Sequence, residues 1–149
     1  MNSKQSQIDV IEMIARKEET LCQLYETYSD KFQDHRDFWL DIAAEETQHA
    51  NWIRELRSLV EEGTVDFKED RFNKEAIQTF IEYLERELTK AREQEMSLIN
   101  ALSTALYIEE ALLERKFFVV YETDVLQLKR ILLDIATSVE GHVQRVREA

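Results

Sequence analysis

Apolar residues recur along residues 39–60 with a spacing that alternates between three and four, as on the buried stripe of a helix in a bundle. The positions on this stripe are Trp39, Ile42, Glu46, His49, Ile53, Leu56 and Val60. Glu46 and His49 lie one helical turn apart on the same face. Burying an ionised carboxylate without a partner costs several kcal/mol. The pattern therefore predicts that a bound metal ion, or a hydrogen-bonded pair across the bundle, compensates these two side chains.

A second stripe with the same spacing precedes it, and it is also interrupted by one carboxylate. Its positions are Ile11, Ile14, Glu18, Leu21, Tyr25, Tyr28 and Phe32. The two stripes predict a first helix over about residues 3–32 and a second over about 35–62. Asp34 is the expected N-cap of the second helix, and Gly63 is the expected left-handed residue that ends it.

The rest of the chain predicts three further helices. Residues 64–71 are charged and lack periodicity, which indicates a connector, and a crossing helix is expected over about 73–92. A third bundle helix is expected over about 95–121, and a fourth over about 124–147 with Thr123 as its N-cap. The stripe of the fourth helix is Leu128, Leu132, Ile135, Val139, His142 and Val146. We therefore expect an all-α four-helix bundle with an extra crossing helix between helices 2 and 3, forming one domain over residues 1–149.

The amino-acid composition supports this prediction and excludes some classes of binding partner. The 149 residues include no proline and only two glycines, which is too little turn chemistry for a sheet protein. The net charge of −12 argues against nucleic acid and anionic membranes as partners, and it is compatible with binding cations. One cysteine and the lack of a signal-peptide core at the N-terminus lead us to expect a soluble cytoplasmic protein.

Two-metal carboxylate sites in four-helix bundles take one glutamate from each of two helices and a Glu-x-x-His pair from each of the other two. Glu18, Glu46 and His49 complete the first half of such a set. In the second half, the third helix offers Glu109 or Glu110, and the fourth offers His142.

The choice between Glu109 and Glu110 depends on helix register. Glu18 and Glu46 are 28 residues apart, whereas Val139 lies 29 residues after Glu110 and 30 after Glu109. This spacing favours Glu110 by a single loop residue. Each of the two lies on an apolar stripe of its own, so both remain candidate ligands.

With these motifs in place, the chain resembles the rubrerythrin-like branch of the ferritin-like superfamily over most of its length. The resemblance lies in Ala15…Glu18…Tyr25, Phe38-Trp39…Ala43-Ala44-Glu45-Glu46…His49-Ala50, Ala105-Leu106…Glu109-Glu110…Phe117-Phe118 and His142. It implies a ferritin-like bundle with a non-haem di-iron centre and an oxidase, peroxidase or iron-handling activity. The metal ligands that it implies are Glu18, Glu46, His49, Glu109, Glu110 and His142.

The chain departs from this family at Val139, where the second bridging glutamate is expected. Glu140 lies about 100° around the helix from that position and replaces the missing ligand only if the helix is rotated or bulged. We therefore expect one tightly bound metal ion or none, with iron as the first choice and zinc or manganese as alternatives. The competing hypothesis is a metal-free helical interaction protein that kept the fold and lost the chemistry. The sequence leaves a homodimer open.

Overall fold

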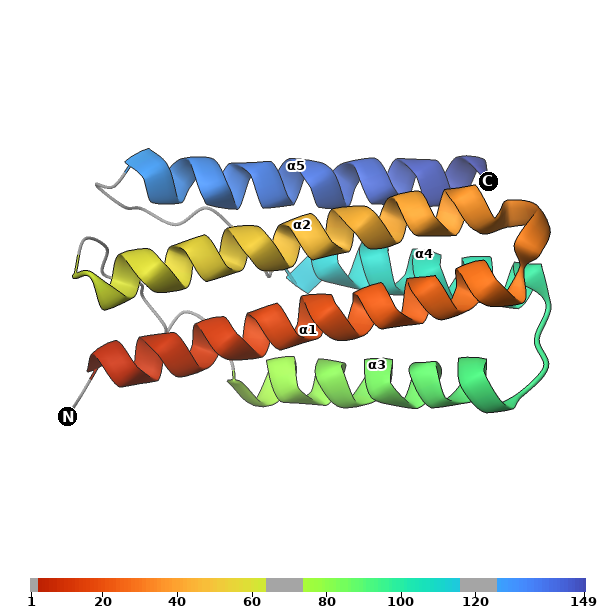
Figure 1. The fold of residues 1–149 in the computed structure, drawn as a ribbon, viewed down its shortest axis with the longest axis horizontal. Coiled ribbons are helices and arrows are strands. Elements are labelled where there is room, and N and C mark those ends of the chain that lie inside the picture. Colours follow the sequence, from red (N-terminus) through yellow and green to blue (C-terminus); the bar gives the residue numbers. More distant parts are fainter. Residues whose placement is uncertain (1–2, 64–73, 116–125) are drawn as a thin grey trace. The chain divides into compact units, whose positions relative to one another are not determined.

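The computed structural model describes residues 3–63, 74–115 and 126–149, and these residues are almost entirely helical. The elements are α1 (Ser3–Lys31), a short 3₁₀ turn η1 (Gln33–His35), α2 (Arg36–Glu61), α3 (Lys74–Glu93), α4 (Leu98–Arg115) and α5 (Leu126–Glu148) (Figure 1). No strand occurs within the described ranges, which confirms the predicted all-α class. The helices belong to two compact units, Met1–Gln94 and Glu95–Ala149, which are described separately below. The single domain over residues 1–149 stays a prediction.

In the first unit, α1 packs against both α2 and α3. Helices α1 and α2 form an antiparallel hairpin. The Lys4 ammonium, near the start of α1, donates a 3.1 Å hydrogen bond to the carbonyl of Glu61 at the end of α2. Helix α3 runs in the same direction as α1 (Figure 1), and Arg16 of α1 forms a 3.0 Å ion pair with Glu85 of α3. Because α2 and α3 both contact α1, a side chain near the middle of α1 is enclosed from two sides.

The predicted apolar stripes form the core of this unit. All seven stripe positions of α2 are buried, and so are the six stripe positions that lie in α1. The seventh position of that stripe, Phe32, follows the end of α1 and is half-buried. Aromatic rings fill the end of the hairpin, where Trp39 meets Tyr28 edge-on at a centroid distance of 4.8 Å and Tyr25 at 5.7 Å. Buried aromatic pairs of this kind contribute about 0.5–1.5 kcal/mol beyond their burial, so they hold the two helices in a fixed register.

Of the two capping residues predicted for α2, the one after its C-terminal end is confirmed and the one at its N-terminal end is wrong. Gly63 has a φ of +79°, and its amide donates to the carbonyl of Val60 at 3.0 Å, which confirms it as the left-handed residue after the helix. The prediction of Asp34 as N-cap was wrong. Asp34 lies inside the 3₁₀ turn, α2 starts two residues later at Arg36, and no side-chain bond caps it. Thr123, the other predicted cap, lies outside the described residues.

In the second unit, α4 packs antiparallel to α5 (Figure 1). Helix α4 begins later than expected, at Leu98, because Ser97 caps it by accepting a 3.1 Å hydrogen bond from the amide of Asn100. The buried face of α4 carries the small residues Ala101 and Ala105. Small side chains on a facing surface let two helix backbones approach each other closely.

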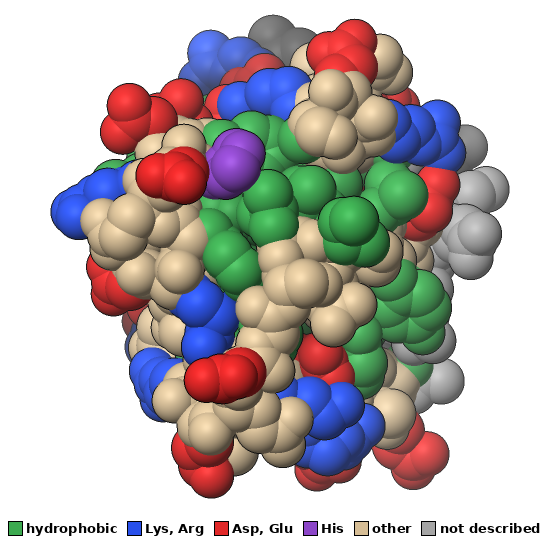
Figure 2. Space-filling view, turned by 90° about the vertical axis from the view of Figure 1, so that its right-hand side faces the viewer, with side chains coloured by type: hydrophobic (Ala, Val, Ile, Leu, Met, Phe, Trp, Pro, Cys, Tyr) green, Lys and Arg blue, Asp and Glu red, His purple; other side chains and the backbone are tan. Residues whose placement is uncertain are grey.

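The surface is mixed in charge. Acidic and basic side chains are interspersed on the face shown in Figure 2, and several form ion pairs between helices, such as Arg54 with Glu19. Within the described residues, no helix has the length and apolar character needed to cross a membrane.

Candidate metal centre

Three of the predicted ligands come together inside the first unit. Glu18 extends from the middle of α1, and Glu46 and His49 extend from one face of α2, as their spacing of three predicts. One donor atom from each of the three residues lies within 4.8 Å of the others. All three side chains are fully buried. The hairpin thus brings two carboxylates and an imidazole to one point in the core.

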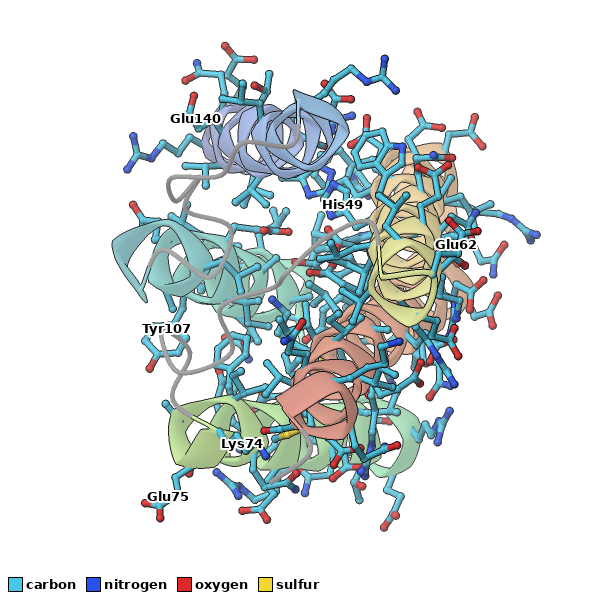
Figure 3. The ribbon with its side chains drawn as sticks, turned by 90° about the vertical axis from the view of Figure 1, so that its left-hand side faces the viewer. His49, Glu62, Lys74, Glu75, Tyr107 and Glu140 are labelled. Atoms are coloured by element: carbon cyan, nitrogen blue, oxygen red, sulfur yellow. The ribbon has the colours of Figure 1, made fainter. Side chains whose placement is uncertain are left out.

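The imidazole is oriented toward both carboxylates. His49 Nδ1 lies 3.3 Å from Glu18 Oε2 and 3.3 Å from Glu46 Oε2. The His49 ring also stacks on Trp52 at a centroid distance of 5.7 Å, which holds its plane. Figure 3 shows His49 in the interior beside α2. Oxygen and imidazole donors that converge in this way suit iron, manganese or zinc.

A fourth charged side chain belongs to this cluster, and the sequence analysis missed it. The side chain of Lys17 is fully buried, and its Nζ lies 3.2 Å from Glu18 Oε1. Lysine is almost never fully buried unless it is paired. The sequence signal for Lys17 is a second stripe on α1 with the same spacing, whose positions are Val10, Ile14, Lys17, Leu21, Leu24 and Tyr28, and all of them are buried. The sequence analysis followed only the stripe through Glu18.

The charges in this cluster shift one another's protonation. Burial alone would raise the pKa of Glu18, but Lys17, Glu46 and His49 outweigh it and hold that pKa well below its usual range. Burial likewise opposes a charge on His49, yet the two glutamates raise the pKa of His49 to about 10. At neutral pH, Glu18 is therefore ionised and His49 carries a proton.

The other two ligand helices form a pair within the second unit. His142 Nδ1 of α5 lies 3.1 Å from Glu109 Oε1 of α4, and both side chains are fully buried. Glu110, which the spacing argument favoured, is instead half-exposed and pairs with Arg147. Glu109 shares the buried face of α4 with Ala105 and its neighbours, so helix periodicity places Glu110 toward solvent.

Comparison with known proteins was uninformative. No family model, curated protein or solved structure matches this chain. What the centre binds is therefore inferred from its own side chains.

The position on α5 where the sequence analysis expected a bridging glutamate holds a buried valine. Val139 is buried one turn before His142, whereas Glu140 is exposed on α5 (Figure 3). Helix α5 is thus not rotated in the way that would bring Glu140 to the inward position. Among the residues that the structure describes, the second unit therefore offers one buried carboxylate, Glu109, and one buried imidazole, His142.

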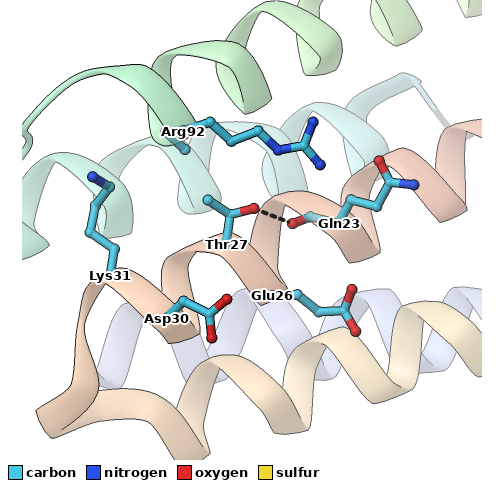
Figure 4. A pocket seen from close by; sticks show the side chains of 7 residues that line it. Gln23, Glu26, Thr27, Asp30, Lys31 and Arg92 are labelled. Atoms are coloured by element: carbon cyan, nitrogen blue, oxygen red, sulfur yellow. Dashed lines mark hydrogen bonds between the residues drawn. The ribbon is translucent and has the colours of Figure 1, made fainter.

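Two other features of the first unit lack the convergent donors of a metal or catalytic site. An open groove of about 550 Å³ lies between α1 and α3 (Figure 4), and its charged lining residues are Glu26, Asp30, Lys31 and Arg92. These mixed, solvated charges converge on no single point. Cys22, one turn after Glu18, is half-buried, and its Sγ lies 3.2 Å from Thr47 Oγ1. Burial raises the pKa of the Cys22 thiol, which makes it a poor ligand or nucleophile at neutral pH.

The raised pKa of His49 predicts that metal affinity depends on pH. A metal ion binds only the neutral imidazole, so between the ordinary value of 6.5 and about 10 each bound ion must displace the His49 proton. Affinity should therefore rise by up to about tenfold per pH unit over this interval, and about one proton should be released per ion. Calorimetric titration with Zn²⁺ or Mn²⁺ in buffers of different ionisation enthalpy measures that release. Affinity that does not change with pH would show that metal binding displaces no proton from His49.

Proposed function

We propose that this chain is a rubrerythrin-like protein of the ferritin-like class that binds non-haem iron in the interior of a helical bundle. The observation that carries the proposal is the convergence of Glu18, Glu46 and His49, fully buried and with donor atoms within 4.8 Å of one another. Iron bound by carboxylates and imidazole can exchange electrons with oxygen or peroxide. The function proposed for such a centre is an oxidase, a peroxidase or a carrier of iron.

In the proposed ferritin-like bundle, Glu109 and His142 supply the second half of the ligand set. The buried contact between them, at 3.1 Å, repeats in α4 and α5 the pairing of Glu18 with His49 in α1 and α2. Only three inward carboxylates are then available, because Val139 stands where a fourth would be. Three carboxylates leave two divalent cations incompletely neutralised, so we propose one tightly held ion per chain.

A second candidate function is a metal-free helical protein that acts through its surface. It is favoured by the cations that the first unit already contains, since Lys17 and protonated His49 both contact Glu18. An internal ammonium and an imidazolium can balance two buried carboxylates without a metal. In that case the cluster stabilises the hairpin and carries no chemistry.

Thermal melting with and without metal separates the two functions. An ion that binds only the folded chain stabilises it by about 2.7 kcal/mol when its free concentration is a hundred times the Kd. We expect a chelator to lower the melting temperature of protein purified without one, and Fe²⁺, Mn²⁺ or Zn²⁺ to restore it. A melting temperature that stays the same with chelator and with excess metal would support the metal-free function instead.

A further inference from the structure

Each of the two oxygens of Glu18 lies beside a nitrogen atom of another buried side chain. Its Oε2 lies 3.3 Å from His49 Nδ1, on the side of the proposed metal, and its Oε1 lies 3.2 Å from Lys17 Nζ. All of these side chains are fully buried. A carboxylate that bridges two metal ions uses its oxygens in the same way, with one oxygen for each cation. In this chain the second oxygen is already engaged by an ammonium.

We propose that the Lys17 ammonium takes the place of a second metal ion beside Glu18, so that the centre is built for one metal and one lysine. This inference rests on the proposed metal-binding function and specifies the stoichiometry of that same site.

The charge balance of the first unit supports this arrangement. Two carboxylates, Glu18 and Glu46, face one ammonium in a fully buried cluster. With His49 neutral, one divalent ion leaves a single excess positive charge, whereas two would leave three. Uncompensated charge in a low-dielectric interior is strongly unfavourable. An ammonium and a metal ion beside the same carboxylate oxygen also repel each other, which disfavours a second ion at Glu18 Oε1.

Lys17 is suited to this role by its position and its shape. It directly precedes Glu18 on α1, about 100° around the helix, and its long side chain reaches Glu18 Oε1 inside the core. An ammonium is a compact point charge, unlike the broad guanidinium of arginine, so it can stand where a small metal cation would. The exposed lysine Lys90 of α3 pairs instead with Glu87 at the surface of the same unit and provides a natural control.

The test compares the wild type with Lys17→Met and Lys17→Gln, and with Lys90→Met as the matched control. Each protein is titrated with Mn²⁺, and bound metal is counted by elemental analysis. We expect one ion in the wild type and in Lys90→Met. Both Lys17 variants should bind a second ion, held more weakly than the first because Val139 still leaves the pair one carboxylate short. Electron paramagnetic resonance provides an independent readout, since an isolated Mn²⁺ ion and an exchange-coupled pair give different hyperfine patterns.

Loss of a buried charge can weaken folding, and melting curves cover that case. In the Lys17 variants the second equivalent of Mn²⁺ should still raise the melting temperature, whereas in the wild type only the first equivalent should do so. This readout does not require the metal-free variant to be fully folded, because metal binding favours the folded form.

The outcomes separate this inference from the proposed function. One ion in the wild type and also in the Lys17 variants would overturn the role of Lys17 and leave the metal function intact. Two ions in the wild type would likewise overturn the role of Lys17 and leave the metal function intact. No ion in any variant would overturn both proposals. No ion in the wild type but binding in Lys17→Met would reject the metal function of the natural chain and support the ammonium as the occupant of the site.

Discussion

Replacing His49 with glutamine is expected to abolish stoichiometric metal binding while leaving the helices folded. His49 Nδ1 lies 3.3 Å from Glu18 and from Glu46, so it is the donor that completes the cluster. Loss of a partner that only orients a ligand already costs about 10–100-fold in affinity, and loss of a ligand itself should cost at least about 100-fold. Elemental analysis after gel filtration measures the retained metal, and circular dichroism checks the helices.

The chain contains its own control for this substitution. His35 is exposed on the 3₁₀ turn before α2 and lies outside the cluster. His35→Gln should retain metal as the wild type does. If His49→Gln and the wild type bind equal amounts of metal, the ion does not bind at this cluster. If neither binds metal and His49→Gln unfolds, the histidine has a structural role.

Replacing Glu18 with glutamine is expected to cause the largest loss of stability in the metal-free protein, about 3–5 kcal/mol. Glu18 is the anion that contacts both Lys17 and His49 in the core. Removing its charge leaves two buried cationic groups with less compensation, and this costs far more than the loss of a surface pair. Urea unfolding in the presence of chelator, followed by circular dichroism, measures the change in the free energy of unfolding.

The next residue along the helix provides the comparison. Glu19 is exposed and pairs with Arg54 on α2, and exposed ion pairs are worth about 0–1 kcal/mol. Glu19→Gln should therefore scarcely change unfolding. Equal, small effects of the two substitutions would show that water reaches Glu18 and that the cluster is not desolvated in solution.

The helices and the first half of the centre could be predicted because they depend on local periodicity. A stripe with alternating spacing requires one face of α2 to be buried, and Glu46 and His49 lie on that face whatever the rest of the chain does. The same holds for Glu18 on α1. Every one of these side chains is buried in the structure.

The remaining errors arise where residues were counted across a connection, or where only one of two possible stripes on a helix was followed. Counting residues from α4 to α5 crosses a connection of unknown geometry, so a difference of one residue wrongly favoured Glu110 over Glu109. The small residues Ala101 and Ala105 mark the buried face of α4 and would have been the better guide. Lys17 was missed because it lies on a second stripe of α1, with Val10, Ile14, Leu21 and Leu24, which was not followed beside the stripe through Glu18. Whether the two units form one ferritin-like domain stays a prediction.

The contact between Cys22 and Thr47 offers a way to follow the motion of the hairpin. Cys22 is the chain's single cysteine, and its Sγ lies 3.2 Å from Thr47 Oγ1, so it sits on α1 against α2, one turn from Glu18. A half-buried thiol with a raised pKa reacts more slowly with alkylating reagents than a free thiol, and its reaction should be faster when the helices separate. Conditions that open α1 from α2 should therefore raise the rate of its modification. The natural chain thus carries a kinetic probe of the contact between these two helices, with no engineered label required.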